Sequence, residues 1–260
     1  TAVPAVKRRP DAGFTLIELL AALAILVMIV TMLGIIFTES DRAWTLGTNR
    51  SDNNLAGRSA LNMLSHDLQY AVADDILSYA NRPDRHGLTT FDFLNDELCF
   101  VSIENDSSDD NRAAREIHYY VRENPAGSRR YELMRGYFSE SILADPLNHS
   151  YHNRLWYDTP GAGGLGRPSN SYFIAKNVVG FAVWAQNSDN ELTREYVSTD
   201  AAHTNRLPQY VDVCIELLND RAARQAADIE SRGLHTEAVE FVKRNLVRHV
   251  TRVYFHNRDG

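Results

Sequence analysis

The hydrophobic residues of this chain are concentrated near its N-terminus. From Leu19 to Phe37 no residue is charged. At ~1.5 Å per residue, a helix over this run, begun at Phe14, crosses the ~30 Å hydrocarbon core of a bilayer. Basic residues precede the run and acidic residues follow it, so the positive-inside rule places the residues before the run in the cytoplasm. The pattern predicts a single-pass transmembrane helix over 14–38, with the rest of the chain on the far side of the membrane.

A second hydrophobic pattern follows this helix at a spacing of three to four residues. The apolar positions are Leu61, Leu64, Leu68 and Val72, and the polar residues between them are Asn62, Ser65, Asp67 and Gln69. This spacing is typical of one apolar face of a helix. The sequence therefore predicts that the helix continues through 39–76, with a frayed or bent stretch at Thr45–Asn54, where good helix formers are few.

From residue 77 onward, short apolar or alternating runs bounded by turn residues predict β-strands. The runs are Phe91–Phe93, Leu98–Ile103, Ile117–Arg122, Arg130–Arg135, Val178–Ala185, Tyr210–Leu218 and Val250–Phe255. Asn124–Ser128 predicts a hairpin turn, and 139–170 has the composition of a loop. A charged segment near 219–248 predicts a helical insertion. We expect an α+β fold in which the long N-terminal helix packs on an antiparallel β-sheet domain over 77–260.

Charge excludes one class of partner. The net charge is −7, and residues 1–13 contribute +2 (Lys7, Arg8 and Arg9 against Asp11), which leaves −9 for the rest. An acidic soluble part argues against nucleic-acid binding, which needs lysine and arginine to neutralise phosphates. Hence we expect no nucleic-acid partner.

Two cysteines are too few for a disulfide scaffold. Strict alternation in the run that contains Cys214 places it on the face of Asp212 and Glu216, opposite the aliphatic residues. Cys99 shares a face with Val101 in another run. The sequence does not show that the two thiols face each other, and two unpaired cysteines are the favoured interpretation.

Three segments contain residue types that are found in ligand sites. The segment Glu104–Asn111 is rich in the oxygen ligands that calcium prefers, but it lacks EF-hand spacing, so a solvated turn is favoured. His149 and His152 have no evident third zinc ligand. The glycine-rich 161–166 segment is not followed by the Lys-Ser/Thr pair of a P-loop. With no nucleophile motif either, we expect no cofactor, no metal and no enzymatic activity.

Glu18 is the anomaly of the apolar run. A carboxylate in a membrane helix is unfavourable, by ~2–3 kcal/mol when it lies at mid-bilayer. A carboxylate among apolar residues near the start of such a helix therefore usually has a partner. An ordinary secretory signal would have a shorter apolar core followed by a small-x-small site, which the sequence does not show cleanly. A plain signal anchor fits the hydropathy but leaves Glu18 unexplained.

Gly13-Phe14-Thr15-Leu16-Ile17-Glu18 resembles the processing site of type IV prepilins and pseudopilins. The resemblance implies that residues 1–13 are a leader peptide, that prepilin peptidase cuts between Gly13 and Phe14, and that the new amino terminus of Phe14 is N-methylated. It also implies a role for Glu18 in subunit assembly. In a filament, the Phe14 amine could pair with Glu18 of a neighbouring subunit and so neutralise two buried charges.

The later elements are similar to those of the J-type minor pseudopilins of type II secretion systems, and equally to pilin-like cassette proteins of Verrucomicrobia-type genomes. The matching pieces are the Leu61–Gln69 helix end, the paired runs Ile117–Arg122 and Arg130–Arg135, the strand Val178–Ala185, and Leu207-Pro208. The segments 139–170 and 219–248 are longer than a compact J-type domain requires.

The resemblance implies a structural, non-catalytic subunit of a secretion pseudopilus. Its partners would be other pilins or pseudopilins, contacted through the N-terminal helix, together with prepilin peptidase and the inner membrane, from which the subunit could be extracted into a filament. The alternative is a minor type IV pilin whose soluble domain binds a surface or a ligand. A membrane-tethered enzyme is the least favoured class.

Overall fold

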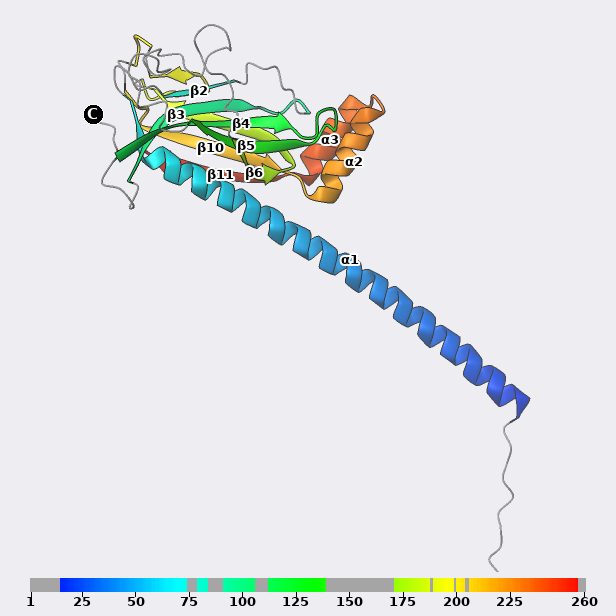
Figure 1. The fold of residues 1–260 in the computed structure, drawn as a ribbon. Coiled ribbons are helices and arrows are strands. Elements are labelled where there is room, and N and C mark those ends of the chain that lie inside the picture. Colours follow the sequence, from blue (N-terminus) through cyan, green and yellow to red (C-terminus); the bar gives the residue numbers. More distant parts are fainter. Residues whose placement is uncertain are drawn as a thin grey trace, which may run out of the picture. The chain divides into compact units, whose positions relative to one another are not determined.

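The structure is a computed structural model that describes residues 15–73, 79–83, 91–105, 112–138, 171–187, 189–198, 200–203 and 206–256. The chain divides into two compact units, Thr1–Thr48 and Asn49–Gly260. Helix α1 runs from Leu16 to Gln69 (Figure 1). The backbone is helical through 45–54, so the predicted fraying is not seen there. Val72, predicted as part of the helical face, lies instead in strand β1 (Ala71–Val72).

The larger sheet is antiparallel and seven-stranded, with the order β6-β5-β4-β3-β2-β9, and β1 pairs with β3. Its other strands are β2 (Ala80–Pro83), β3 (Asp96–Asn105), β4 (Arg112–Glu123), β5 (Tyr131–Phe138), β6 (Ser171–Lys176) and β9 (Tyr196–Val197). Strands β4 and β5 are neighbours with Glu123 opposite Tyr131, which confirms the predicted hairpin.

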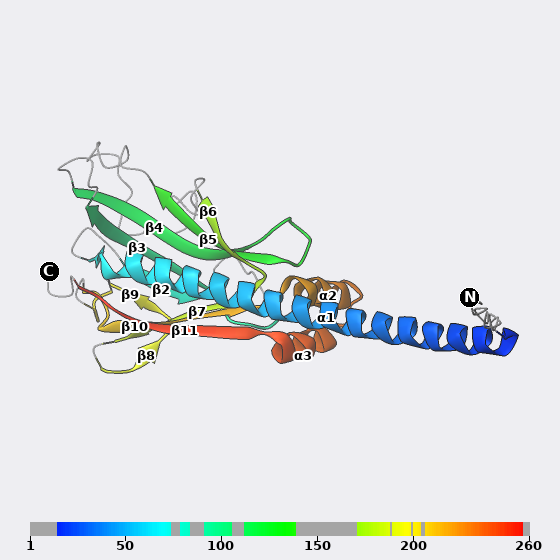
Figure 2. The same cartoon turned by 90° about the horizontal axis from the view of Figure 1, so that it is seen from below.

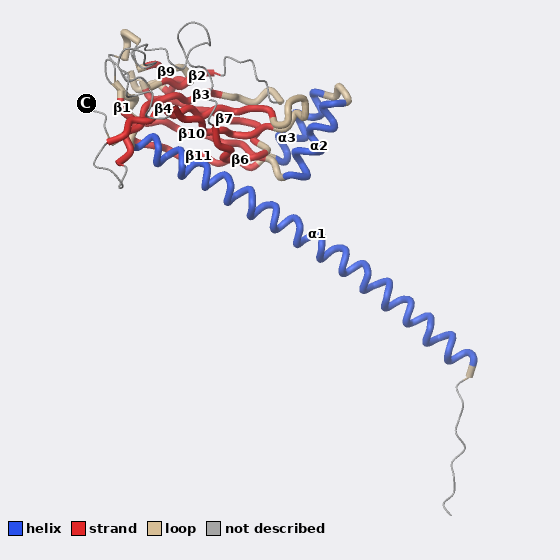
Figure 3. The backbone as a smooth tube through the Cα atoms, in the orientation of Figure 1, coloured by secondary structure: helices blue, strands red, loops and turns tan. Residues whose placement is uncertain are grey.

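The second sheet has four strands in the order β11-β10-β7-β8. They are β7 (Val178–Gln186), β8 (Leu192–Thr193), β10 (Tyr210–Leu217) and β11 (Val247–Tyr254). The segment between β10 and β11 forms two helices, α2 (Asp220–Ser231) and α3 (His235–Asn245), at one end of the strands (Figure 3). Asn219 caps α2 by accepting a hydrogen bond from the Ala222 amide at 2.7 Å. Strand β11 begins at Val247, three residues before the predicted start.

One hydrophobic core joins the C-terminal part of α1 to both sheets. Leu64 and Leu68 of α1 are fully buried in it. They share the core with Phe100, Tyr119 and Leu133 of the larger sheet and with Phe181, Val183 and Ile215 of the smaller one. In the view of Figure 2, the last turns of α1 run in line with the strands of both sheets. The predicted α+β fold, with a long N-terminal helix and an antiparallel sheet domain, is confirmed.

Asp67 fixes the end of α1 to the larger sheet. Its carboxylate accepts hydrogen bonds from Arg135 Nε at 2.6 Å and Nη2 at 3.2 Å, and from the Tyr119 hydroxyl at 2.6 Å. Burial, and then the Asp67 carboxylate, raise the pKa of Tyr119 well above its usual value, so the phenol remains a donor. The sequence pattern identifies Asp67 only as one of the polar residues between the apolar positions. In the structure it is buried, and a bidentate guanidinium compensates its charge.

The segment before β3 is not the strand that the alternation Phe91-Asp92-Phe93 predicted. Phe91 and Asp92 have φ angles of 46° and 61°, in the left-handed region that interrupts a strand. The chain then runs beside β7, where Asn95 forms a parallel bridge with Phe181 and the Phe181 amide donates to the Leu94 carbonyl at 2.9 Å. This segment therefore borders the smaller sheet.

Candidate assembly segment

Helix α1 begins with a reciprocal cap between Thr15 and Glu18. The Thr15 amide and hydroxyl each donate to Glu18 Oε2 at 2.9 Å, and the Glu18 amide donates to Thr15 Oγ1 at 3.4 Å. This is the capping box expected for Thr-x-x-Glu at a helix start. Glu18 Oε1 accepts no hydrogen bond from the residues that the structure describes. The cap thus holds the carboxylate in place and leaves one oxygen open to a donor from outside the chain.

Apolar side chains cover α1 on all sides beyond this cap. Those between Leu16 and Phe37 are all exposed, and Leu16–Thr45 is long and apolar enough to cross a membrane. Glu18 is the only charged residue between Thr15 and Thr38. Apolar surface of this extent is unfavourable in water, so it needs lipid or the helices of other subunits around it.

The few polar groups within the run are satisfied inside the helix. The hydroxyls of Thr31 and Thr38 donate to the carbonyls of Val27 and Gly34, each at 2.8 Å. In an apolar medium an unsatisfied hydroxyl is costly, and this bond to the preceding turn removes the cost. Both threonines are therefore compatible with a membrane or with a packed bundle of helices.

The end of the run has the residues of a membrane–water boundary. Glu39 and Arg42 form an ion pair at 2.8 Å, one turn apart on the helix. Trp44, whose side chain is 75% exposed, follows them. Charged pairs and tryptophan are typical of the headgroup region, so this part of α1 suits the interface.

Of the site residues predicted from sequence, only Glu18 is described by the structure. Gly13 and Phe14 lie outside the described residues, as do His149, His152 and the 161–166 segment. Most of the acidic Glu104–Asn111 segment lies outside them too. Among the described residues no group of three or more His, Cys, Asp or Glu side chains could hold a metal ion. Cys99 and Cys214 are both buried, and they lie in different sheets.

The sequence interpretation missed the partner of Glu18 within its own helix. In the sequence, Thr15 is recognisable as part of the processing motif. A threonine three residues before a glutamate is also the signal of a capping box, and this signal predicts the contact with Glu18. The threonine hydrogen bonds farther along α1 were also missed. They have no separate sequence signal beyond a hydroxyl residue inside an apolar helix.

Comparison with known proteins agrees with this geometry. The family described as "Prokaryotic N-terminal methylation motif" matches residues 8–34. No curated protein matches the chain. The match and the apolar helix define a prepilin-type protein with an N-terminal methylation motif. The motif supports a type IV pilin-like protein, a class that prepilin peptidase processes and that assembles with other pilin subunits.

Proposed function

We propose that this chain is a structural minor pseudopilin, cut by prepilin peptidase between Gly13 and Phe14 and assembled into the pseudopilus of a type II secretion-like system. Its soluble domain would lie in the periplasm and carry no enzymatic activity. The observation that carries the proposal is Glu18, the single charge in an otherwise uncharged, fully exposed run that the methylation motif overlaps.

Glu18 supports assembly by its chemistry. Cleavage would create a positive amine at Phe14, and a filament would bring that amine to Glu18 of a neighbouring subunit. Glu18 Oε2 is engaged by Thr15, while Oε1 remains available for this amine. A carboxylate is unfavourable among apolar helices when alone and much less so when paired with a cation. Subunit association would therefore relieve the cost of placing Glu18 in the run.

A minor type IV pilin is the second candidate. The observation that favours it is an open groove on the smaller sheet, lined by Trp184, Cys214, Val250 and seven other residues, which offers the soluble domain a place to bind a partner. Glu18 is compatible with both candidates, so the preference for a pseudopilin over a minor pilin rests on the order of elements, with the β4–β5 hairpin after the helix and the paired β7 and β10 later in the chain.

Deletion of the gene separates the two candidates. Loss of protein export with normal surface filaments is the result we expect for a pseudopilin. Complementation with the wild-type gene should restore export, whereas Glu18→Val should not. Normal export together with lost surface attachment or piliation would contradict the pseudopilin assignment and support the minor pilin.

A further inference from the structure

The smaller sheet buries one face and leaves the other open. Along β11, Val247, His249 and Thr251 are partly buried and Val253 fully so, while the alternate residues Arg248, Val250, Arg252 and Tyr254 are exposed. On the open face, Val250 pairs across the sheet with Cys214, which pairs in turn with Ala182. Val250 is 60% exposed although it is aliphatic. This face therefore presents an aliphatic side chain to solvent.

The open face contains a groove of about 350 Å³. Its lining residues are Asp92, Phe93, Leu94, Gly180, Ala182, Trp184, Cys214, Glu216, Arg248 and Val250. The small residues Gly180, Ala182 and Cys214 provide depth, and the segment that runs beside β7 provides one wall. The volume falls within the range of ordinary ligand pockets, which combine apolar walls with a few convergent polar groups.

Glu216 is the principal polar group of the groove. It is only 7% exposed, and its Oε1 accepts a hydrogen bond from Arg248 Nε at 2.7 Å. Its Oε2 lies directly over Gly180, where an added Cβ would come within 2.4 Å of it. Oε2 accepts no hydrogen bond from the described part of the chain. A largely buried carboxylate oxygen without a donor favours an incoming hydrogen-bond donor, above all a charged one.

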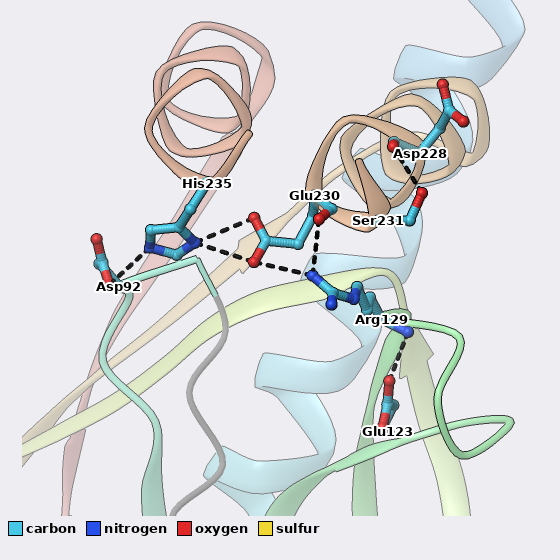
Figure 4. Close-up of polar contacts among 7 residues, drawn as sticks. All are labelled: Asp92, Glu123, Arg129, Asp228, Glu230, Ser231 and His235. Atoms are coloured by element: carbon cyan, nitrogen blue, oxygen red, sulfur yellow. Dashed lines mark hydrogen bonds and ion pairs between the residues drawn. The ribbon is translucent and has the colours of Figure 1, made fainter. Parts of the chain in front are cut away.

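A second carboxylate stands at the rim. Asp92 Oδ1 lies 3.2 Å from His235 Nε2, and Nδ1 of the same imidazole lies 3.0 Å from both carboxylate oxygens of Glu230. Glu230 in turn pairs with Arg129 Nη1 at 3.0 Å (Figure 4). This chain of contacts connects the groove wall to α2, α3 and the β4–β5 hairpin. The second oxygen of Asp92 has no hydrogen bond within the described ranges.

We infer that this groove is a docking site for an arginine or lysine side chain of a partner protein. The apolar stem would pack against Trp184, Leu94 and Val250, and the cationic head would reach Glu216 Oε2 and Asp92. An aromatic wall also suits a cation electrostatically. The chain beyond residue 13 carries a net charge of −9, which attracts a basic partner. The inference does not rest on the pseudopilin assignment, since the groove does not involve the N-terminal segment.

The test uses the full chain in detergent micelles with 13C-methyl labels on alanine and valine. Two probes are titrated: N-acetylarginine methylamide and its neutral isostere, N-acetylcitrulline methylamide. The arginine probe should shift the Ala182 and Val250 methyl signals saturably, and the citrulline probe should bind at least about tenfold more weakly, because only a charged donor gains the stronger hydrogen bond.

Two variants and one control variant test whether the arginine probe binds in the groove. Ala182→Leu fills the floor of the groove and should abolish the shift at Val250. Asp92→Asn removes an exposed rim carboxylate and should weaken arginine binding even if Ala182→Leu fails to fold. Tyr254 lies on the same strand and the same face as Val250 but does not line the groove, so Tyr254→Ala should leave binding unchanged. Equal affinity for the two probes, an absence of saturable shifts, or shifts insensitive to Asp92→Asn would overturn the proposal.

Discussion

Gly57 of α1 lies directly against the imidazole of His249 in β11. A methyl group added at Gly57 would come within 2.3 Å of His249 Cδ2 and 2.8 Å of its Cγ. The second distance matters because rotation of the ring about the Cβ–Cγ bond leaves Cγ in place, so turning the ring alone does not relieve the contact. Gly57 therefore permits the close approach of the helix to the smaller sheet.

We predict that Gly57→Ala lowers the free energy of unfolding by about 1–3 kcal/mol, the usual range for overpacking. Alanine is the better helix former by ~1 kcal/mol, so a loss would show that the contact outweighs propensity. His249→Ala should remove most of the penalty in the double mutant. Gly47→Ala, at a glycine with nothing within 4 Å, is the matched control and should not destabilise. Equal effects of the two glycine substitutions in denaturant titrations would contradict the contact.

Asp67→Asn should be among the most destabilising polar substitutions in the sheet domain. It leaves the largely buried Arg135 guanidinium without its counter-charge, and breaking such a pair costs about 3–5 kcal/mol. Glu240→Gln breaks an exposed pair with Arg244 one turn away and should cost less than about 1 kcal/mol. Chemical denaturation measures both. A cost for Asp67→Asn no larger than that for Glu240→Gln would mean that Asp67 does not hold α1 to the sheet.

The periodicity that predicted the apolar face of α1 could not predict the role of Asp67. Leu61, Leu64 and Leu68 recur within the helix, so their burial is visible in the local pattern. The partners of Asp67 are Tyr119 and Arg135, which lie 52 and 68 residues away in the chain. A local pattern assigns every polar residue to solvent. Only the strand register that brings these two side chains together shows otherwise.

The two candidate sites also differ in whether their residues are close together or far apart in the sequence. The assembly segment is local, so Glu18 and its neighbours could be recognised from six consecutive residues. The groove is assembled from β7, β10, β11 and the segment at Phe93, which are far apart in sequence. The alternation in β10 predicted that Cys214 and Glu216 share a face, and both line the groove. The other walls had no sequence signal.

The contacts of His235 should depend on pH in a defined direction. Hydrogen bonds to Glu230 and Asp92, and then the charge of Glu230, raise the pKa of His235 above its usual 6.5. A raised pKa in the folded state means that the stabilisation is present below the unfolded pKa and is lost as the pH rises through the folded value. Arg129 also faces Glu230 and pairs with its carboxylate at 3.0 Å.

An NMR titration of the His235 ring measures this directly. We expect a midpoint above 6.5, and faster amide exchange at the start of α3 once the pH exceeds that midpoint. Glu230→Gln should lower the midpoint. His203 provides the comparison within the chain, because burial lowers its pKa. A His235 midpoint at or below that of His203 would show that the contacts in Figure 4 do not persist in solution.

Two substitutions at Glu18 separate helix capping from charge pairing. Glu18→Gln keeps a carbonyl oxygen that can accept from the Thr15 amide but removes the charge. Glu18→Val removes both, and loss of a cap costs about 0.5–2 kcal/mol. If charge pairing drives assembly, both variants should be cleaved normally, and both should crosslink poorly to partner pilins. Normal assembly of Glu18→Gln would assign Glu18 to capping alone, and blocked cleavage would assign it to peptidase recognition.

The proposed function requires that prepilin peptidase cuts the chain between Gly13 and Phe14. Intact-mass and N-terminal analysis of the protein extracted from membranes measures where the mature chain begins. We expect a mature chain that begins at Phe14 with one added methyl group on its amine. A mature chain that begins within or beyond the apolar run, or one that retains residues 1–13 in cells with active prepilin peptidase, would contradict it.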